Sequence, residues 1–295
     1  MYKNIVTIKM FFFGALYCFV ASVSASTENI AYLAYASDFW QVWVMDSSGK
    51  KQRQLSNVKY DISRVSWFPD QKHLLINGTQ GQLAKVSIET GKTVPVNIPL
   101  KGTTDAVISP NGKQIAFSVS TAEGIDTNNI WIVNINGKNL RKITKMGYLQ
   151  HEPVWSVSGD DIYFLSGDGK QSHNIFKVNV KTTNVDQLTV GKLYHFDLAI
   201  NSNDELAFSS NRLGNYELFR FTNDKVAKRL TSHPALDGRP SWSPDMQGLI
   251  FESTRLGSPN LWYIDLNSHQ LKQLTFYKRG ARSPVWFQPS TGETK

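Results

Sequence analysis

The sequence predicts an all-β protein, a six-bladed β-propeller with four antiparallel strands in each blade. Three observations carry this prediction. Apolar and polar residues alternate with a period of about two, one strand pattern recurs every 41–47 residues, and the two ends of the chain supply complementary parts of one repeat. The 295 residues include 8 Trp, 11 Tyr and 16 Phe, enough to fill a large core, which excludes a disordered chain.

Each repeat begins with an apolar pair and a Ser-Pro-Asp turn or a relic of one. A strand like Ile-Ala-Phe-Ser follows, then a strand like Ile-Trp-Ile-Val, then Leu-x-x-Leu-Thr. The second apolar residue of each copy is taken as its anchor. The anchors are Trp67, Ile108, Trp155, Ile200, Trp242 and Trp286. Constant strand patterns at this period, separated by turn signals such as Asn-Gly, are typical of propeller blades.

The two ends of the chain determine the number of blades. Before the first anchor there are only three strand patterns, Ile30–Tyr35, Gln41–Asp46 and Gln52–Ser56, and after the last complete repeat there is only one, Pro284–Phe287. Together they make one blade, so we expect the C-terminal strand to join the N-terminal blade and close the ring. Closure removes two exposed sheet edges. Five whole blades and this composite blade make six.

Tryptophan placement fits the same plan. Seven of the eight tryptophans fall at repeat positions, on the first strands or the third strands, where we expect them to pack between blades. These are Trp67, Trp155, Trp242, Trp286, Trp43, Trp131 and Trp262. The exception is Trp40, which we place in a loop of the first blade as a candidate surface contact.

The first 25 residues are predicted to be a signal peptide. Lys3 and Lys9 precede an apolar stretch, and the small residues that follow it predict cleavage after Ala25. An uncleaved leader that anchors the chain in the inner membrane is the alternative. The domain prediction is therefore a signal peptide over 1–25, a propeller over 26–289 and a flexible tail over 290–295. The single cysteine, Cys18, lies in the leader. A chain without cysteine after cleavage suits an oxidising compartment, and a Gram-negative periplasm is the expected one. We expect the protein to be monomeric.

The basic charge is consistent with an exported chain. The formal net charge is +8 for the whole chain, and it falls to +6 if the leader with its two lysines is removed. Export takes the chain away from nucleic acid. A protein or peptide partner in the envelope is therefore the expected partner, with no nucleic acid and no membrane span after cleavage.

Two long segments are similar to a known repeat. They are SPDMQGLIFESTRLGSPNLWYIDLNSHQLKQLT from Ser243 and SPNGKQIAFS…NIWIVNINGKNLRKIT from Ser109. Both strongly resemble the TolB-type β-propeller repeat, which is distantly WD-like, and the resemblance covers nearly the whole chain after the leader. TolB carries an α/β domain ahead of its propeller, so we expect a stand-alone propeller resembling its C-terminal domain. Similar propellers form sensing parts of membrane-bound transcription regulators and gating domains of prolyl-oligopeptidase-type peptidases.

Candidate site residues follow from propeller topology, because the starts of the first strands converge on one mouth of the central channel. Counting three residues back from each anchor gives one position per blade: Arg64, Asp105, Glu152, Asp197, Arg239 and Ser283. Adjacent positions add His151, His195, Asp237 and Arg282. This mixed ring could orient a polar ligand or a peptide terminus. The structural alternative is that the charges pair with one another and with water.

Catalytic signatures are not found. The sequence contains no Gly-x-Ser-x-Gly, no His-Glu-x-x-His and no phosphate-binding glycine loop. We therefore expect no catalytic residue, no cofactor and no metal, and interpret the chain as a non-catalytic periplasmic interaction module. One alternative is a metal-dependent, carbohydrate-active enzyme like the related oligogalacturonate lyases, using His151 and His195, although the arginines of the mouth disfavour a cation there. Another is a ligand sensor that partners a membrane protein.

Overall fold

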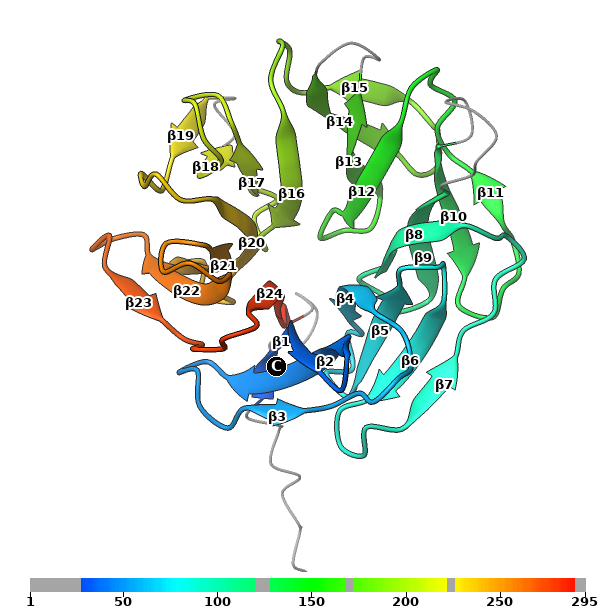
Figure 1. Cartoon of the computed structure of the whole chain (residues 1–295). Coiled ribbons are helices and arrows are strands. Elements are labelled where there is room, and N and C mark those ends of the chain that lie inside the picture. Colours follow the sequence, from blue (N-terminus) through cyan, green and yellow to red (C-terminus); the bar gives the residue numbers. More distant parts are fainter. Residues whose placement is uncertain (1–27, 120–127, 168–171, 222–225, 290–295) are drawn as a thin grey trace, which may run out of the picture.

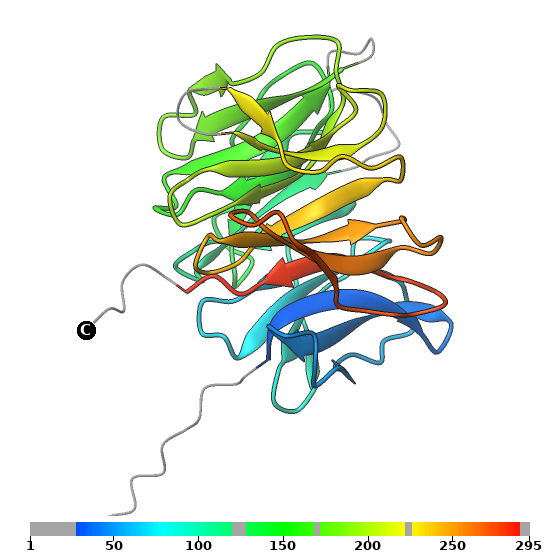
Figure 2. The same cartoon turned by 90° about the vertical axis from the view of Figure 1, so that its left-hand side faces the viewer.

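A computed structural model describes residues 28–119, 128–167, 172–221 and 226–289. In these residues the chain forms 24 strands and no helix, and hence no helix that could cross a membrane. The strands make six four-stranded sheets, which are the blades of a ring (Figure 1). The view from the side shows that the ring is a thick disc (Figure 2). The predicted six-bladed, all-β propeller is confirmed. The predicted leader and tail lie outside the described residues.

The first three blades each contain four strands, ordered from the channel outward. Blade 1 contains β24 (Ala281–Trp286), β1 (Glu28–Ala36), β2 (Phe39–Asp46) and β3 (Arg53–Gln54). Blade 2 contains β4 (Ile62–Trp67), β5 (His73–Gly78), β6 (Leu83–Ser87) and β7 (Thr93–Pro95). Blade 3 contains β8 (Thr103–Ile108), β9 (Gln114–Val119), β10 (Ile130–Asn134) and β11 (Arg141–Lys142).

The other three blades have the same order. Blade 4 contains β12 (Gln150–Trp155), β13 (Asp161–Gly167), β14 (His173–Asn179) and β15 (Val185–Gln187). Blade 5 contains β16 (His195–Ile200), β17 (Leu206–Ser210), β18 (Glu217–Phe221) and β19 (Ala227–Arg229). Blade 6 contains β20 (Asp237–Trp242), β21 (Gly248–Ser253), β22 (Asn260–Asp265) and β23 (Leu271–Gln273).

The serine of the repeat turn joins the first and second strands of a blade. Ser109 Oγ accepts a hydrogen bond from the backbone N–H of Gln114 at 2.9 Å and donates one to Asn111 Oδ1 at 2.8 Å. Gly112 takes a φ of 71°, which glycine adopts without a Cβ clash. The copy that begins at Ser243 repeats both serine bonds, at 2.9 and 2.5 Å. The recurring serine thus stabilises the turn that reverses the chain.

Ring closure occurs as expected, with β24 antiparallel to β1 in the sheet order β24-β1-β2-β3. The strand is longer than its predicted core and begins at Ala281. Trp40 corrects another boundary: it lies inside β2, paired with Tyr35, rather than in a loop. The turn before it is shorter than expected, because Ser37 and Asp38 reverse the chain with φ values of 50° and 69°.

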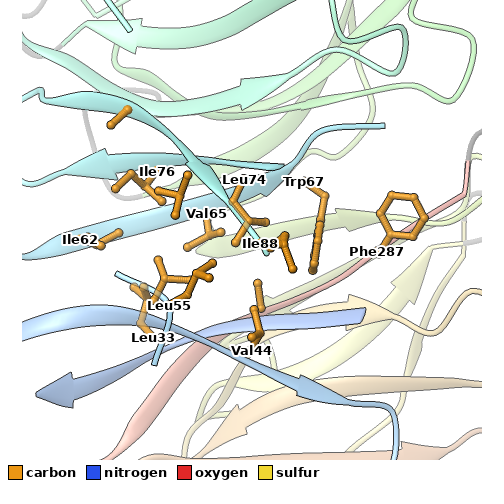
Figure 3. Packing of buried hydrophobic residues seen from close by; sticks show 14 residues of the cluster. Leu33, Val44, Leu55, Ile62, Val65, Trp67, Leu74, Ile76, Ile88 and Phe287 are labelled. Carbon is orange, nitrogen blue, oxygen red and sulfur yellow. The ribbon is translucent and has the colours of Figure 1, made fainter. Parts of the chain in front are cut away.

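The core is a ring of six apolar clusters, one at each junction between neighbouring blades. Figure 3 shows the junction of blades 1 and 2, where Leu33 and Val44 face Leu74 and Trp67. The seven repeat tryptophans all pack in these clusters, which confirms their predicted structural role. The indole N–H of Trp67 also donates to the Val285 carbonyl at 2.9 Å and so ties blade 2 to the closing strand.

Candidate binding site at the channel mouth

The six innermost strands surround a central cavity of about 880 Å³. They are β4, β8, β12, β16, β20 and β24, which encircle the centre of the ring (Figure 1). All six predicted mouth positions line this cavity, namely Arg64, Asp105, Glu152, Asp197, Arg239 and Ser283. The four adjacent positions do not line it. The lining also includes Asp70, Asn111 and Ser202, in turns that join first strands to second strands, so the cavity is not confined to the mouth.

The mouth positions share an unusual backbone. Five of the six are non-glycine residues in the left-handed region, with φ between 49° and 59°: Asp105, Glu152, Asp197, Arg239 and Ser283. Each lies at an interruption of the register between its strand and the neighbouring one. Such residues are strained and persist only where the surroundings hold them, and bulges redirect side chains next to functional sites. Here they point the mouth residues toward the channel.

A chain of hydrogen bonds holds these strained residues. The carboxylate of one blade accepts the backbone N–H of the mouth residue in the next blade. Asp105 accepts from Glu152 at 3.4 Å, Glu152 from Asp197 at 2.6 Å, and Asp197 from Arg239 at 3.1 Å. In the next step Glu252 of β21 accepts from Ser283 at 3.4 Å. Sequence reasoning missed Glu252, because it lies on a second strand.

Charge is divided across the mouth. Blades 3, 4 and 5 contribute Asp105, Glu152 and Asp197, whereas blades 6, 1 and 2 contribute Arg239, Arg282 and Arg64. The two signs meet at the seams. Arg64 Nη1 lies 3.7 Å from Asp105 Oδ1, and Arg239 Nη1 donates to Glu252 Oε2 at 2.7 Å. The expected internal pairing therefore exists for two of the three arginines.

The carboxylates of blades 4 and 5 titrate differently. Burial opposes the charge of Glu152, but the hydrogen bond from His151 and the positive Arg64 outweigh it, so the pKa of Glu152 lies below its usual value. Burial and the negative Glu152 raise the pKa of Asp197 to about 6, against the opposing effect of Arg239. Asp197 therefore gains its proton near pH 6 and is mostly charged at neutral pH.

Arg282 is the exception among the arginines. Its guanidinium lies over the Trp40 ring, 3.9 Å from the centroid, and its Nε is buried without a hydrogen-bond partner. Within the described residues it forms no ion pair with a carboxylate. Burial and repulsion from Arg239 lower the pKa of Arg282, against the weaker opposing attraction of Glu252 and Asp61. The contact with Arg282, which comes from the opposite end of the chain, thus places Trp40 at the mouth.

An aromatic wall stands beside the carboxylates of blades 4 and 5, and no pattern in the sequence indicates it. We define it as His151, His173, Tyr194, Phe196 and Tyr216. The centroids of His151 and His173 are 4.9 Å apart, those of His173 and Phe196 are 5.0 Å apart, and those of Phe196 and Tyr216 are 5.8 Å apart. The nearby Asp197 contributes to the raised pKa of Tyr216, after burial and Tyr194. The wall is therefore close to the acidic half of the mouth.

Two predicted site residues are corrected. His195 is 2% exposed and Asp237 is 0% exposed, so neither reaches the mouth surface. They occupy the first positions of β16 and β20, where the side chain points into the blade. His195 packs edge-on against Phe208 at 5.1 Å, and Asp237 accepts two hydrogen bonds from Arg255. Both are structural residues.

Substituting His195 with glutamine is expected to flatten the fall in stability at acid pH. Burial and the charges of Arg212 and His173 lower the pKa of His195 to about 4. Between pH 6.5 and pH 4, His195 is therefore protonated in the unfolded chain but not in the folded chain. This difference lowers the free energy of unfolding by up to about 3 kcal/mol at pH 4. Asp197, whose pKa is raised to about 6, has the opposite effect: its protonation increases the free energy of unfolding as the pH falls from 6 toward 4.

Urea unfolding at pH 7 and pH 4.5, for the wild type and His195→Gln, measures this difference. The substituted protein should lose about 2 kcal/mol less than the wild type between the two pH values. Equal losses in the two proteins would mean that His195 is not held neutral by the fold.

Comparison with known proteins decides the family. Residues 30–205 match the model of the TolB beta propeller domain, which is more than half of the chain. The chain belongs to the TolB β-propeller family. This confirms the resemblance in the repeats. The TolB-like propeller is also similar to TolB from Acinetobacter baumannii, with a TM-score of 0.78 and 19% identity over 89% of this chain and 67% of that one.

Relatives of this TolB-like propeller include proteins named as enzymes. The uncharacterized peptidase YuxL of Bacillus subtilis is 30% identical over 165 residues, which are 56% of this chain and 24% of the relative. The chain thus spans about a quarter of that relative. An oligogalacturonate lyase from Vibrio parahaemolyticus has a TM-score of 0.58 and 18% identity over 81% of this chain and 76% of that one, which shows a shared fold alone.

The lyase alternative requires a metal site. Across the described part of the TolB-like propeller, no group of three or more His, Cys, Asp or Glu side chains is arranged to hold a metal ion. The proposed pair is separated as well, since His151 belongs to the aromatic wall while His195 is buried in its blade.

Proposed function

We propose that this TolB-like propeller is a non-catalytic periplasmic module that binds a peptide segment of an envelope protein at its channel mouth. The observation that carries the proposal is Arg282, a guanidinium stacked on Trp40 without a carboxylate partner among the described residues. Partly buried charges are usually paired. A carboxylate of a bound peptide would complete this arginine.

The opposite half of the mouth suits a basic group. Asp197 and Glu152 supply negative charge, and the aromatic wall beside them offers ring faces on which a Lys or Arg side chain can lie. A segment with charges of opposite sign a few residues apart would therefore match both halves. The bonded backbone beneath these residues keeps the mouth preorganised, which lowers the ordering cost of binding.

Loss of mouth charges is expected to abolish partner binding. The chain, expressed with its own leader and a C-terminal tag, is used to capture proteins from envelope extract, which are identified by mass spectrometry. Arg282→Gln should reduce recovery of the main partner by about tenfold, since a hydrogen bond between charged groups contributes about 1.5–3 kcal/mol. Asp197→Ala with Arg239→Ala should abolish recovery.

The control is Lys181→Gln, at an exposed position on the opposite face, which should capture as the wild type does. Melting temperatures of all variants identify any that fail to fold. If the folded Asp197→Ala, Arg239→Ala protein keeps every partner of the wild type, the channel-mouth proposal fails.

The enzymatic alternative predicts a different response. We propose that the protein needs no cofactor, so its melting temperature should be the same with Mn²⁺ and with EDTA. A rise with Mn²⁺ that is lost in His151→Gln would instead favour a metal-dependent lyase. If a small molecule rather than a protein raised the melting temperature through Arg282, the sensor alternative would be favoured.

A further inference from the structure

Five exposed apolar side chains lie on the face of the disc that carries the channel mouth. They are between 52% and 79% exposed and occupy five different loops: Val190, Leu213, Leu236, Leu256 and Phe276. Connections from a second to a third strand, or from a fourth strand to the next blade, lie on the mouth face, and all five loops are of these kinds. We call these five residues the apolar arc.

The arc is continuous, because its loops are hydrogen-bonded in sequence around the rim from blade 4 to blade 1. The contacts are Tyr194 N to Asn211 Oδ1 at 3.1 Å, Asp237 N to Tyr216 O at 3.0 Å, Leu236 N to Thr254 Oγ1 at 3.1 Å, and Ser258 Oγ to Lys278 O at 2.8 Å. Each apolar residue therefore lies beside a loop that carries the next one. None of the five lines the channel cavity.

The arc is also basic. Its loop segments 190–194, 211–216, 232–236, 254–259 and 276–280 contain no Asp or Glu, and they contain the exposed cations Lys192, Arg212, Lys278 and Arg279. Arg255 also lies in these segments, but its side chain is only 9% exposed and is paired with Asp237. Three of these five segments have an exposed cation within three residues of the apolar side chain. The turns of the opposite face are instead mixed in charge. They carry Asp46, Asp70, Glu89, Asp160, Asp204, Asp245 and Asp265 together with Lys50, Lys51, Lys72, Lys92, Lys113, Lys138 and Lys181. Apart from Val226, next to β19, the described turns of that face include no exposed large apolar side chain.

We propose that the apolar arc seats the propeller on an anionic phospholipid surface. Single apolar side chains on separate loops of one flat face can each enter the headgroup region, while neighbouring Lys and Arg are attracted to lipid phosphates. A protein partner would instead favour large anchors that are buried together in a pocket at the centre of an interface. The absence of acidic residues from the arc loops gives it the complementary charge.

Binding in this way turns the channel mouth toward the membrane. The mouth and the arc share one face, so a peptide that enters the mouth would come from a protein held at the same membrane. Binding to lipid does not itself depend on the mouth residues, and the two proposals can fail separately.

Sedimentation with lipid vesicles tests the arc. The full chain is mixed with vesicles of phosphatidylcholine alone, or of phosphatidylcholine with about one third phosphatidylglycerol, whose surface charge attracts basic segments. The protein should sediment with the anionic vesicles only, and less so as salt is raised. Leu256→Ser with Phe276→Ser, and separately Lys192→Gln with Lys278→Gln, should each reduce the bound fraction at least fivefold.

Matched controls lie on the outer strands and the opposite face. Val94→Ser with Val185→Ser removes two apolar side chains that are also exposed, and Lys181→Gln removes an exposed cation; both proteins should bind as the wild type does. Arg282→Gln should also leave vesicle binding unchanged. Failure of the wild type to sediment with anionic vesicles at low salt overturns the proposal. Vesicle binding that persists in both arc variants also overturns the proposal. This holds as well if the arc variants instead lose a protein that the wild type captures from envelope extract.

Discussion

Replacing Arg255 with methionine is expected to lower the free energy of unfolding by about 3–5 kcal/mol. Its Nη2 donates to both carboxylate oxygens of Asp237, at 3.0 and 2.9 Å, and the two side chains are only 9% and 0% exposed. The guanidinium also lies 5.4 Å from the Phe251 centroid and 4.8 Å from that of Trp262. Methionine fills similar space but leaves a buried carboxylate without its counter-charge.

Urea unfolding of the wild type and the variant at neutral pH provides the measurement. Lys181→Met is the control, because the Lys181–Asp160 pair is 81% and 53% exposed and should contribute less than about 1 kcal/mol. Adding Asp237→Leu to Arg255→Met should restore much of the loss, since no buried charge then remains. An Arg255→Met protein as stable as the wild type would show that buried Asp237 does not depend on Arg255 for its counter-charge.

Deleting residues from Ala281 onward should abolish cooperative folding. Strand β24 is the innermost strand of blade 1, and its loss leaves β1 without a partner on the channel side. It also removes Trp286 from the cluster between blades 6 and 1, and the Val285 carbonyl from the Trp67 indole. Because domains are stable by only about 5–15 kcal/mol, the removal of one strand from two junctions exceeds what the ring can tolerate.

Calorimetry and size-exclusion chromatography distinguish the outcomes. The truncated chain should show no single sharp unfolding transition and should elute as aggregates, because open sheet edges pair with other chains. The control is deletion of residues 290–295 alone, which is expected to leave the transition unchanged. A soluble, monomeric truncation with a sharp transition would mean that five blades and an open sixth are sufficient.

The fold could be predicted from the sequence because its signals are local and repeated. Trp67, Trp155, Trp242 and Trp286 each end a first strand, and the turn that follows the first three of them at a fixed distance reports the blade without reference to the rest of the chain. The split of the composite blade also followed from counting strand patterns at both ends. Only strand limits shifted, as at Trp40, where a turn made by two left-handed residues was shorter than the pattern suggested.

The site was less predictable, since side-chain direction at the mouth depends on the backbone. A strict two-residue alternation does not separate Asp197 from its neighbours, whereas the left-handed residue in each first strand does. That conformation is held by carboxylates from the preceding blade, and no residue type at the position itself signals it. His195 was therefore misplaced, and the aromatic wall, assembled from four segments of blades 4 and 5, had no contiguous motif.

Closure of the ring also sets an order of events in time. The hydroxyls of Tyr32 and Tyr277 lie 3.0 Å apart although 245 residues separate them in the chain. At synthesis rates of about 5–20 residues per second, the first three strands wait on the order of ten seconds or more for the strand that completes their sheet. Contacts this distant form late and slowly. The first strands to be made are thus the last to be completed, and we expect a helper that shields them, or export before folding, to raise the yield of the native ring.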